Sequence, residues 1–245
     1  MKVSFKTDIG CTRSQNQDAV FVSEKPVGPL ENLFIVADGM GGHNAGDYAS
    51  KKAIDLIFSS IREDEEDSGI SAIQRGITIA NREIFIEASQ NQEKSGMGTT
   101  VVVATIENGM LEVANVGDSR LYVLSKGDLI QVTRDHSVIE EMVRKGEVSR
   151  EMAQKHPKRN LITRAVGAEE EVRIDLFDVD LSDVDAVLMC TDGLTTMVED
   201  AKIAEIMSLG MTVEHKVAAL IKEANAGGGK DNITVLMIES MFDEV

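Results

Sequence analysis

Residues 99–128 read TTVVVATIENGMLEVANVGDSRLYVLSKGD, and the alternation of apolar runs with turn residues in this stretch indicates a class of fold. Runs rich in valine, isoleucine and leucine favour β-strands, and glycine with asparagine or aspartate favours the turns between them. Turns this short suit hairpins, so we predict antiparallel pairing and not the βαβ crossovers of a parallel sheet. The strands are expected at Thr99 to Ile106, Leu111 to Val116 and Leu121 to Ser125, with turns at 107–109, 117–119 and 126–128.

The rest of the chain adds further strands and two pairs of helices. Apolar residues recur every three or four positions from Ala49 to Ile61 and from Ile70 to Ala88, which is the period of a helix with one buried face. Shorter helices are predicted at Asp200 to Leu209 and at Val213 to Ala224. We therefore predict an α/β (α+β) fold, a layered α-β-β-α sandwich of two packed, mainly antiparallel sheets flanked by helix pairs. The remaining strands are expected at Val3 to Thr7, Ala19 to Ser23, Leu33 to Ala37, Val172 to Phe177, Ala186 to Cys190 and Ile233 to Ile238.

The composition favours one domain and argues against several classes of partner. The chain has 245 residues, of which 42% are hydrophobic and only three are proline, and no linker-like stretch interrupts it. We therefore predict a single domain over residues 1–245. A formal net charge of -17 would repel a nucleic-acid backbone or an anionic membrane surface. We expect no nucleic-acid partner, no membrane association and a monomer.

The chain is expected in the cytoplasm. Residues 1–10 alternate polar and apolar side chains and lack the continuous apolar run of a signal peptide. The strongly apolar stretches, such as Val101 to Ala104, are far shorter than the ~20 residues needed to cross a bilayer. Cys11 and Cys190 are too few for a disulfide framework or a zinc site, and we interpret them as reduced, buried thiols.

Four aspartates stand beside strand ends, next to small or turn-forming residues. The first opens the motif Asp38-Gly39-Met40-Gly41-Gly42-His43, directly after an apolar run. A single Asp-Gly pair after a strand is usually only a turn. The same arrangement recurs at Asp118, Asp192 and Asp231. Carboxylates gathered at one edge of packed sheets would supply the oxygen ligands that Mg²⁺ and Mn²⁺ prefer.

These motifs and several others occur in an order that resembles the metal-dependent protein phosphatases of the 2C type, particularly the bacterial members. The resemblance covers nearly the whole chain, and although each motif is short, the ordered set is specific. The matching motifs are Arg13-Ser14-Gln15-Asn16-Gln17-Asp18, Asp38-Gly39-Met40-Gly41-Gly42-His43, Gly98-Thr99-Thr100, Gly117-Asp118-Ser119-Arg120, Thr133-Arg134-Asp135-His136-Ser137, Asn160-Leu161-Ile162-Thr163-Arg164-Ala165-Val166-Gly167, Thr191-Asp192-Gly193 and Asp231-Asn232-Ile233-Thr234.

The resemblance implies that one aspartate bridges two cations and that other oxygen ligands complete each site. The bridging ligand would be Asp38, and the others would be Asp18 with the Gly39 carbonyl at one site and Asp192 with Asp231 at the second. Asp118, together with Asp192, would hold a third, looser cation. The implied cofactors are two or three Mn²⁺ or Mg²⁺ ions, and a flap near the active site is implied at about residues 137–165.

The resemblance also implies hydrolysis of phosphoserine and phosphothreonine in proteins. Arg13 would hold the substrate phosphate, because a planar guanidinium can donate two parallel hydrogen bonds to phosphate oxygens. Two cations about 4 Å apart could share a water, lower its pKa and direct the bridging hydroxide at phosphorus without a covalent phosphoenzyme. The expected partners are phosphorylated proteins, including a serine/threonine kinase and its substrates.

The histidines carry weaker signals. Many eukaryotic family members have a histidine directly after the Asp-Gly pair, where it resembles a general acid, but Met40 stands there in this chain. Protonation of the leaving oxygen, ordering of a water and capping of the following helix are all open to His43. His136 is interpreted as a structural residue. The basic run at 155–159 either steers acidic substrate segments or forms a solvated loop.

A cysteine-based phosphatase is excluded, because it needs an arginine six positions after its thiolate and this chain has Gln17 and Thr196 there. Two alternatives to a general phosphatase are open. One is a catalytically weak metal-binding module with a regulatory role, and the other is a phosphatase dedicated to a sigma-factor regulator. The presence of Arg13 together with the full set of aspartates favours the general enzyme.

Overall fold

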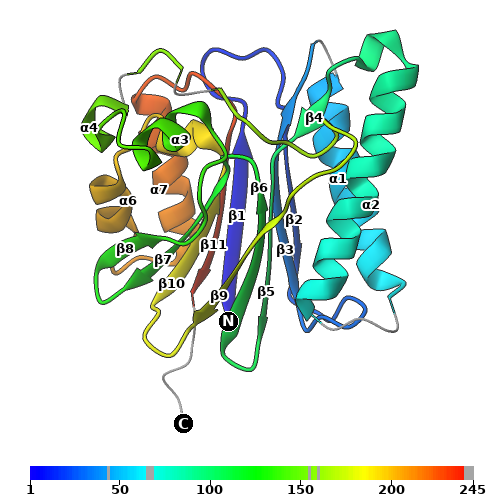
Figure 1. Cartoon of the computed structure of the whole chain (residues 1–245). Coiled ribbons are helices and arrows are strands. Elements are labelled where there is room, and N and C mark those ends of the chain that lie inside the picture. Colours follow the sequence, from blue (N-terminus) through cyan, green and yellow to red (C-terminus); the bar gives the residue numbers. More distant parts are fainter. Residues whose placement is uncertain (43–44, 65–68, 154–155, 159–160, 240–245) are drawn as a thin grey trace.

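Two β-sheets lie face to face between two layers of helices in the computed structural model, which describes residues 1–42, 45–64, 69–153, 156–158 and 161–239 (Figure 1). The predicted α-β-β-α sandwich is confirmed. All pairs between neighbouring strands in these residues are antiparallel.

The first sheet joins the two ends of the chain. The N-terminal strand pairs with the C-terminal strand over its whole length, from Lys2 opposite Glu239 to Asp8 opposite Ile233. In spatial order, this sheet contains β1 (Lys2–Asp8), β11 (Ile233–Glu239), β10 (Ala186–Cys190), β7 (Arg120–Ser125) and β8 (Asp128–Gln131).

The second sheet is built mainly from the first half of the chain. Its spatial order is β2 (Asp18–Ser23), β3 (Leu33–Met40), β5 (Val101–Glu107), β6 (Met110–Val116) and β9 (Asp175–Asp180). The short strand β4 (Gly98–Thr99) pairs with the last residues of β3.

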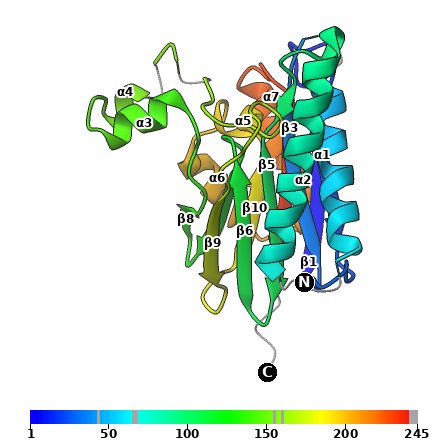
Figure 2. The ribbon, with the colours of Figure 1, turned by 45° about the vertical axis from the view of Figure 1, so that its right-hand side comes forward.

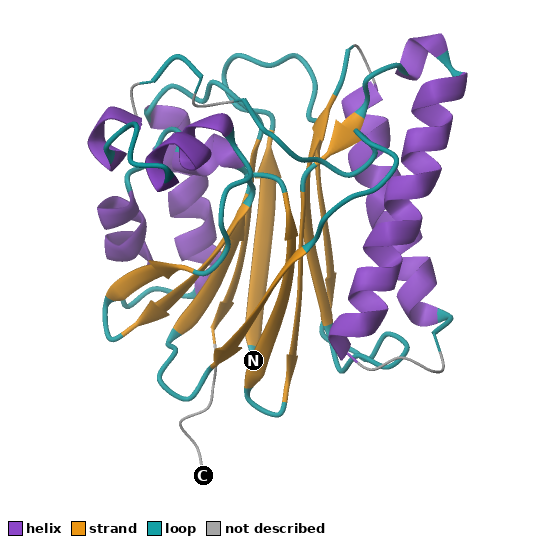
Figure 3. Ribbon diagram, in the orientation of Figure 1, coloured by secondary structure: helices purple, strands orange, loops and turns teal. Residues whose placement is uncertain are grey.

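Helices cover the outer face of each sheet (Figure 3). The long pair α1 (Ala45–Arg62) and α2 (Gly69–Gln90) packs on the second sheet, and α6 (Asp200–Met207) and α7 (Val213–Ala226) pack beside the first. Two short helices, α3 (Val138–Arg144) and α4 (Arg150–Ala153), project from one end of the sandwich (Figure 2). The remaining short elements are η1 (Gln92–Lys94) and α5 (Asp192–Thr195).

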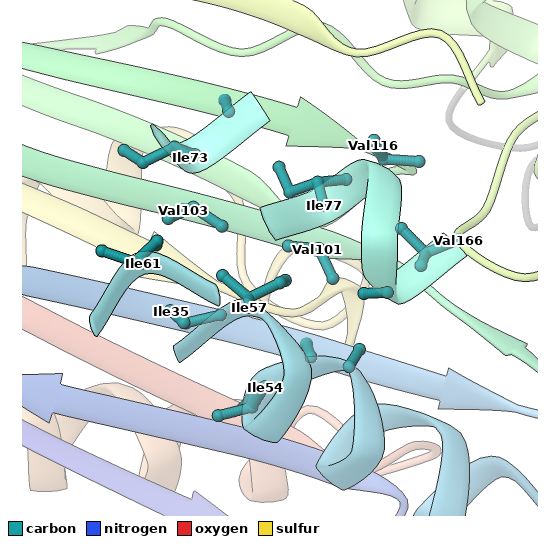
Figure 4. Packing of buried hydrophobic residues seen from close by; sticks show 14 of the residues in the cluster. Ile35, Ile54, Ile57, Ile61, Ile73, Ile77, Val101, Val103, Val116 and Val166 are labelled. Atoms are coloured by element: carbon teal, nitrogen blue, oxygen red, sulfur yellow. The ribbon is translucent and has the colours of Figure 1, made fainter. Parts of the chain in front are cut away.

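Buried apolar side chains form three layers of core. On β3, Ile35 points to the core beneath α1 and α2, whereas Phe34 and Val36 point to the core between the sheets. Because both faces of this strand are buried, its sequence is a continuous apolar run and not an alternating one. Figure 4 shows Ile57 and Ile77 of the two long helices over the strands of the second sheet.

One hairpin prediction is wrong, and the difference decides where the predicted site residue Asp118 lies. The turn at 107–109 joins the paired strands β5 and β6, and the turn at 126–128 joins the paired strands β7 and β8. The turn at 117–119 instead leads from β6 in the second sheet to β7 in the first. Each of these two strands already has neighbours on both sides, so the turn carries Asp118 across the end of the sandwich.

Other boundaries also differ from the prediction. The strand expected at Val172 to Phe177 begins at Asp175, because Val172 and Ile174 pack as a loop against the core under α1 and α2. The strand expected from Thr99 is interrupted at Thr100, and β8, α3, α4 and α5 were not predicted. Within the residues that the structure describes, no helix has the length and apolar character needed to span a membrane.

Candidate active site

Asp18 and Asp38 lie directly opposite each other where β2 begins and β3 ends. Asp18 is buried, and its Oδ2 accepts hydrogen bonds from Thr191 Oγ1 at 2.9 Å and from Thr234 Oγ1 at 2.7 Å. Both threonines belong to the region of β10 and β11, so a carboxylate of the second sheet is bonded to the first. The site therefore lies at one end of the interface between the two sheets.

The backbone around Asp38 is fixed by its neighbours. Its carbonyl oxygen accepts from the Thr100 amide and from Thr99 Oγ1, both at 2.8 Å, and its amide donates to Thr100 Oγ1 at 3.1 Å. The Gly39 amide donates to the Gln17 carbonyl at 3.1 Å, and a Cβ at Gly39 would overlap a carbonyl oxygen at the start of α1. Glycine is therefore required at 39 for β3, β2 and α1 to meet so closely.

The other three predicted aspartates come from loops that end at the same place. Asp192 is the first residue of α5, directly after β10, and Asp118 lies in the turn between the sheets with 8% of its surface exposed. Asp231 stands two residues before β11 and is partly exposed. The structure thus brings all five aspartates to one end of the sandwich.

Burial and mutual repulsion raise the pKa values of four of these carboxyl groups. Burial is the largest cause at each one, and it raises the pKa of Asp18 to about 7, that of Asp192 to about 6 and that of Asp118 to about 8. The pKa of Asp38 is also raised well above its ordinary value, by burial and then by repulsion from the other four aspartates. A concentration of buried negative charge of this kind favours a positively charged ligand.

Arg13 faces the group from the protein surface. Its guanidinium donates from Nη2 to Asp231 Oδ2 at 2.7 Å, and half of its side chain is exposed. The hydrogen bond to Asp231 is the main cause that raises the pKa of Arg13. Its loop is attached at both ends by Asn232, which donates to the carbonyls of Ile9 and Gln15 and accepts from the Gln17 amide.

Divalent cations fit this group of carboxylates. Asp18 Oδ1 and Asp192 Oδ1 are buried and accept no hydrogen bond from the described residues, so each has lone pairs for another ligand. No three His, Cys, Asp or Glu side chains of the described chain lie close enough together to enclose one ion by themselves. Magnesium commonly takes only one or two carboxylates and keeps several waters, so closed cages are not required.

Sequence reasoning assigned no role to the residues that hold the Asp18 carboxylate and the Arg13 loop. Thr191 and Asn232 are each next to a predicted ligand in the sequence, and Thr234 is three positions from one. This closeness in sequence was the available signal. A pocket of about 240 Å³ opens beside Met40 and is also lined by Thr163 and Arg164. His43, for which three roles were open, lies outside the described residues.

Comparisons with known proteins agree on one family. A family model described as protein phosphatase 2C matches residues 12–223. The serine/threonine phosphatase stp of Listeria innocua is 40% identical over 243 residues, which cover 98% of this chain and 96% of that protein. The chain belongs to the protein phosphatase 2C family.

Solved structures of bacterial phosphatases are similar over almost their whole length. Serine/threonine phosphatase Stp1 from Staphylococcus aureus superposes with a TM-score of 0.91 at 33% identity, covering 98% of this chain and 94% of that one. The catalytic domain of the serine/threonine protein phosphatase PstP, solved in complex with two manganese ions, gives a TM-score of 0.84 at 30% identity and covers 97% of each chain.

Proposed function

We propose that this chain is a metal-dependent phosphoprotein phosphatase that removes phosphate from phosphoserine and phosphothreonine by direct hydrolysis. The observation that carries the proposal is the convergence of Asp18, Asp38, Asp118, Asp192 and Asp231 at one end of the sheet interface, with Arg13 beside them. Membership of the protein phosphatase 2C family supports the reaction class.

The proposed cofactors are two or three Mn²⁺ or Mg²⁺ ions. The oxygen donors would be the five aspartates and the Gly39 carbonyl, with Asp38 shared between two ions and Asp118 paired with Asp192 for a third. When bound, such cations lower the pKa of water and neutralise charge on phosphoryl oxygens. The two manganese ions in the PstP structure support metal dependence but belong to that protein.

The chain's own groups would bind and orient the phosphate. Arg13 is half exposed and can present two parallel N–H donors to phosphate oxygens. Its present partner is Asp231, so phosphate and Asp231 compete for the same guanidinium. An arginine that gives up a carboxylate for phosphate keeps its charge paired in both situations, which lowers the cost of substrate binding.

Asp18 would act as a rigid ligand because two threonine hydroxyls fix its Oδ2 and leave Oδ1 without a hydrogen bond from the described residues. The proposed substrates are phosphorylated proteins, including a serine/threonine kinase and its targets. The enzyme itself is proposed to be a monomer in the cytoplasm. A phosphoproteome comparison of cells with and without the active enzyme would identify those substrates.

Turnover of a phosphothreonine peptide with Mn²⁺ tests the proposal. We expect Asp38→Asn to lower kcat/KM by more than the ~10–100-fold that typically follows loss of a residue supporting a metal ligand, and a chelator to abolish turnover. Arg13→Ala should raise KM by about 10-fold or more, because a charge-assisted hydrogen bond is lost. Asp55→Asn, at an exposed position of α1, is the matched control and should change neither constant.

Three results would contradict the proposal. Turnover that is unaffected by chelator would reject the metal mechanism. Tight binding of a phosphoprotein without turnover would favour the regulatory module, and activity confined to one sigma-factor regulator would favour the dedicated phosphatase.

A further inference from the structure

A buried asparagine fixes the loop of residues 167–172 to helix α2 (Figure 1). Asn81 of α2 accepts a hydrogen bond from the Gly167 amide through Oδ1 at 2.7 Å, and its Nδ2 donates to the carbonyls of Glu169 and Glu170, both at 3.1 Å. Only 2% of Asn81 is exposed, so water does not compete for these bonds. The loop and the helix are therefore held in one arrangement.

The chain just before this loop is bonded to the candidate active site. Val166 and Thr99 exchange backbone hydrogen bonds, at 2.8 Å from the Val166 amide and at 3.0 Å from the Thr99 amide. Thr99 also donates from Oγ1 to the Asp38 carbonyl at 2.8 Å. The loop therefore leads from the group of aspartates to the outer surface of α2.

Two hollows adjoin along the loop. Glu169, Glu171 and Val172 line the pocket of about 240 Å³ that opens beside Met40. A second hollow, of about 540 Å³, lies between the loop and α2, and Glu171 and Val172 line it as well. Because the two hollows share these residues, we call them together the lateral groove. It begins beside Met40, two residues after Asp38, and ends on α2.

The lateral groove has an acidic middle and an apolar end. Glu169, Glu170 and Glu171 are exposed, and within the described residues none of the three forms an ion pair. On α2, Phe85 is half-buried and Ile86 is 37% exposed. Unpaired carboxylates attract a cationic side chain, and an open apolar surface is stabilised when another apolar group covers it.

Two arginines also line the groove, one in each hollow. Arg164 donates to Asp175 Oδ1 at 2.8 Å, so its charge is already paired. Arg82 is exposed on α2, in the hollow that contains the apolar end. Neither arginine forms a described ion pair with the three glutamates, so a cation on a bound chain can use them.

We propose that the lateral groove binds the substrate chain on one side of the phosphoresidue. The chain has lysine or arginine close to the phosphoresidue and leucine or phenylalanine farther along. The proposal rests on the phosphatase function, which places the phosphoresidue among the aspartates. The basic side chain pairs with the glutamates while its apolar stem lies on Val172, and the apolar side chain is buried on Phe85 and Ile86. Six extended residues span about 20 Å, so a short peptide suffices for the test.

Three phosphothreonine peptides test the order of residues. One has two lysines and then two leucines after the phosphothreonine, the second has the mirror order before it, and the third has serine at all four positions. The first two carry equal charge, so the net charge of -17 attracts both alike. At about 0.15 M salt, where screening acts beyond about 8 Å, we expect kcat/KM to differ about 10-fold between them, with the serine peptide near the lower value.

Variants of the groove assign this preference to its residues. Glu171→Lys should favour a peptide with glutamate in place of lysine, by about 5-fold. Ile86→Ser should lower kcat/KM about 5-fold, for the preferred leucine peptide alone. Asp55→Lys makes the same change of net charge at an exposed position of α1, and Ile79→Ser removes an exposed isoleucine of α2 that does not line the groove. Neither control should alter the ranking of the peptides.

Two further measurements separate the groove from the chemistry. Each peptide value is divided by the turnover of an aryl phosphate, which is too small to reach α2, so a general loss of activity cancels. In chelator, where no turnover is expected, the preferred peptide should shift the NMR signals of the amides of 168–172 and Ile86 more than the mirror peptide does.

Equal hydrolysis of the two mirror peptides would overturn the proposal, as would a preference that survives Glu171→Lys or changes equally in Asp55→Lys. Failure of the phosphatase function gives a different result, namely no Mn²⁺-dependent turnover of the aryl phosphate. The amide shifts in chelator then still decide whether the groove binds the peptide, because they need neither a cation nor hydrolysis.

Discussion

Asn232 holds the loop that carries Arg13. Its Nδ2 donates to the Ile9 carbonyl at 3.0 Å and to the Gln15 carbonyl at 2.9 Å, and its Oδ1 accepts from the Gln17 amide at 2.8 Å. Only 4% of the residue is exposed, so these bonds are protected from competing water. Asn232 thereby places the arginine relative to Asp231, its neighbour in sequence.

We expect Asn232→Ala to raise KM for a phosphopeptide by about 10-fold and to lower the free energy of unfolding by about 1–3 kcal/mol. The reason for the change in KM is that Arg13 loses its fixed position. Asn32→Ala is the matched control, because Asn32 is equally buried and bonds the Ile106 backbone through both ends of its amide. It should lower stability similarly and leave KM unchanged, and equal KM values in the two variants would contradict the assignment.

The two cysteines differ in environment. Cys190 is fully buried, as predicted, and burial raises its pKa to about 12. Cys11 is exposed, which contradicts the expectation that both thiols are buried, because its loop lies on the surface against Gly229. Oxidation or alkylation of the folded protein should therefore concentrate at Cys11.

At pH 8 the Cys190 thiol is almost wholly protonated, since that pH lies far below its raised pKa. We expect iodoacetamide to modify Cys11 and to leave Cys190 unmodified until the protein unfolds. Peptide mass spectrometry, with Cys11→Ser as the control, measures both sites. Rapid modification of Cys190 in the folded protein would contradict the burial of this side chain.

At the level of strands and turns, the local sequence predicted some strand pairings and not others. The glycine turns at 107–109 and 126–128 predicted true hairpins, because their partners lie next to each other in sequence. The turn at 117–119 also contains glycine but joins two sheets, since pairing with β5, β9, β8 and β10 decides where β6 and β7 lie. Polar and apolar residues alternate in 172–176 and again, in the opposite phase, in 177–180, and pairing with β6 is what places the strand at Asp175–Asp180.

The same limit applies to the site. Strand-end aspartates were recognisable one by one, and the pairing of Asp18 with Asp38 follows from two adjacent strands. The approach of Thr191 and Thr234 to Asp18 depends on the packing of one sheet on the other, which periodicity does not encode. The sequence could therefore predict the carboxylates that would bind cations, but not the threonine hydroxyls that hold Asp18 in place.

The long helices depend on the core beneath them. Ile57 of α1 is fully buried, and Gly76 of α2 packs directly on its backbone. We expect Ile57→Ala to lower the free energy of unfolding by about 2–5 kcal/mol, through lost burial and the cavity left behind. Ile79→Ala, at a position of α2 that is 40% exposed, should change it by less than about 1 kcal/mol. Denaturant unfolding measures both, and equal losses would contradict the observed packing.

At the level of the complete fold, the carboxylate group spans the boundary between the sheets. Asp18 and Asp38 belong to the second sheet, whereas Asp192 and Asp231 flank strands of the first. Their mutual repulsion opposes the packing of the sheets, and divalent cations would relieve it. Cation binding is therefore expected to stabilise the sandwich as a unit.

Mn²⁺ at about 100 times its dissociation constant should stabilise the protein by about 2.7 kcal/mol relative to chelator. For a chain of this size, that corresponds to a rise in Tm of about 5–10 °C. Thermal unfolding with Mn²⁺ and with chelator measures the difference, and Asp38→Asn should reduce it. An unchanged Tm in the original chain would contradict cation binding at this site.

The net charge of -17 extends the same electrostatic argument to the substrate. A phosphopeptide flanked by lysine or arginine is attracted during diffusion to this protein, whereas one flanked by aspartate or glutamate is repelled. At about 0.02 M salt we expect a higher kcat/KM for the basic peptide, and at about 0.5 M salt the two values should converge, because charges are then screened over a few ångströms. A neutral peptide with the same phosphothreonine is the control. A preference for the acidic peptide at low salt would instead indicate that a local basic surface, and not the total charge, directs substrates to the site.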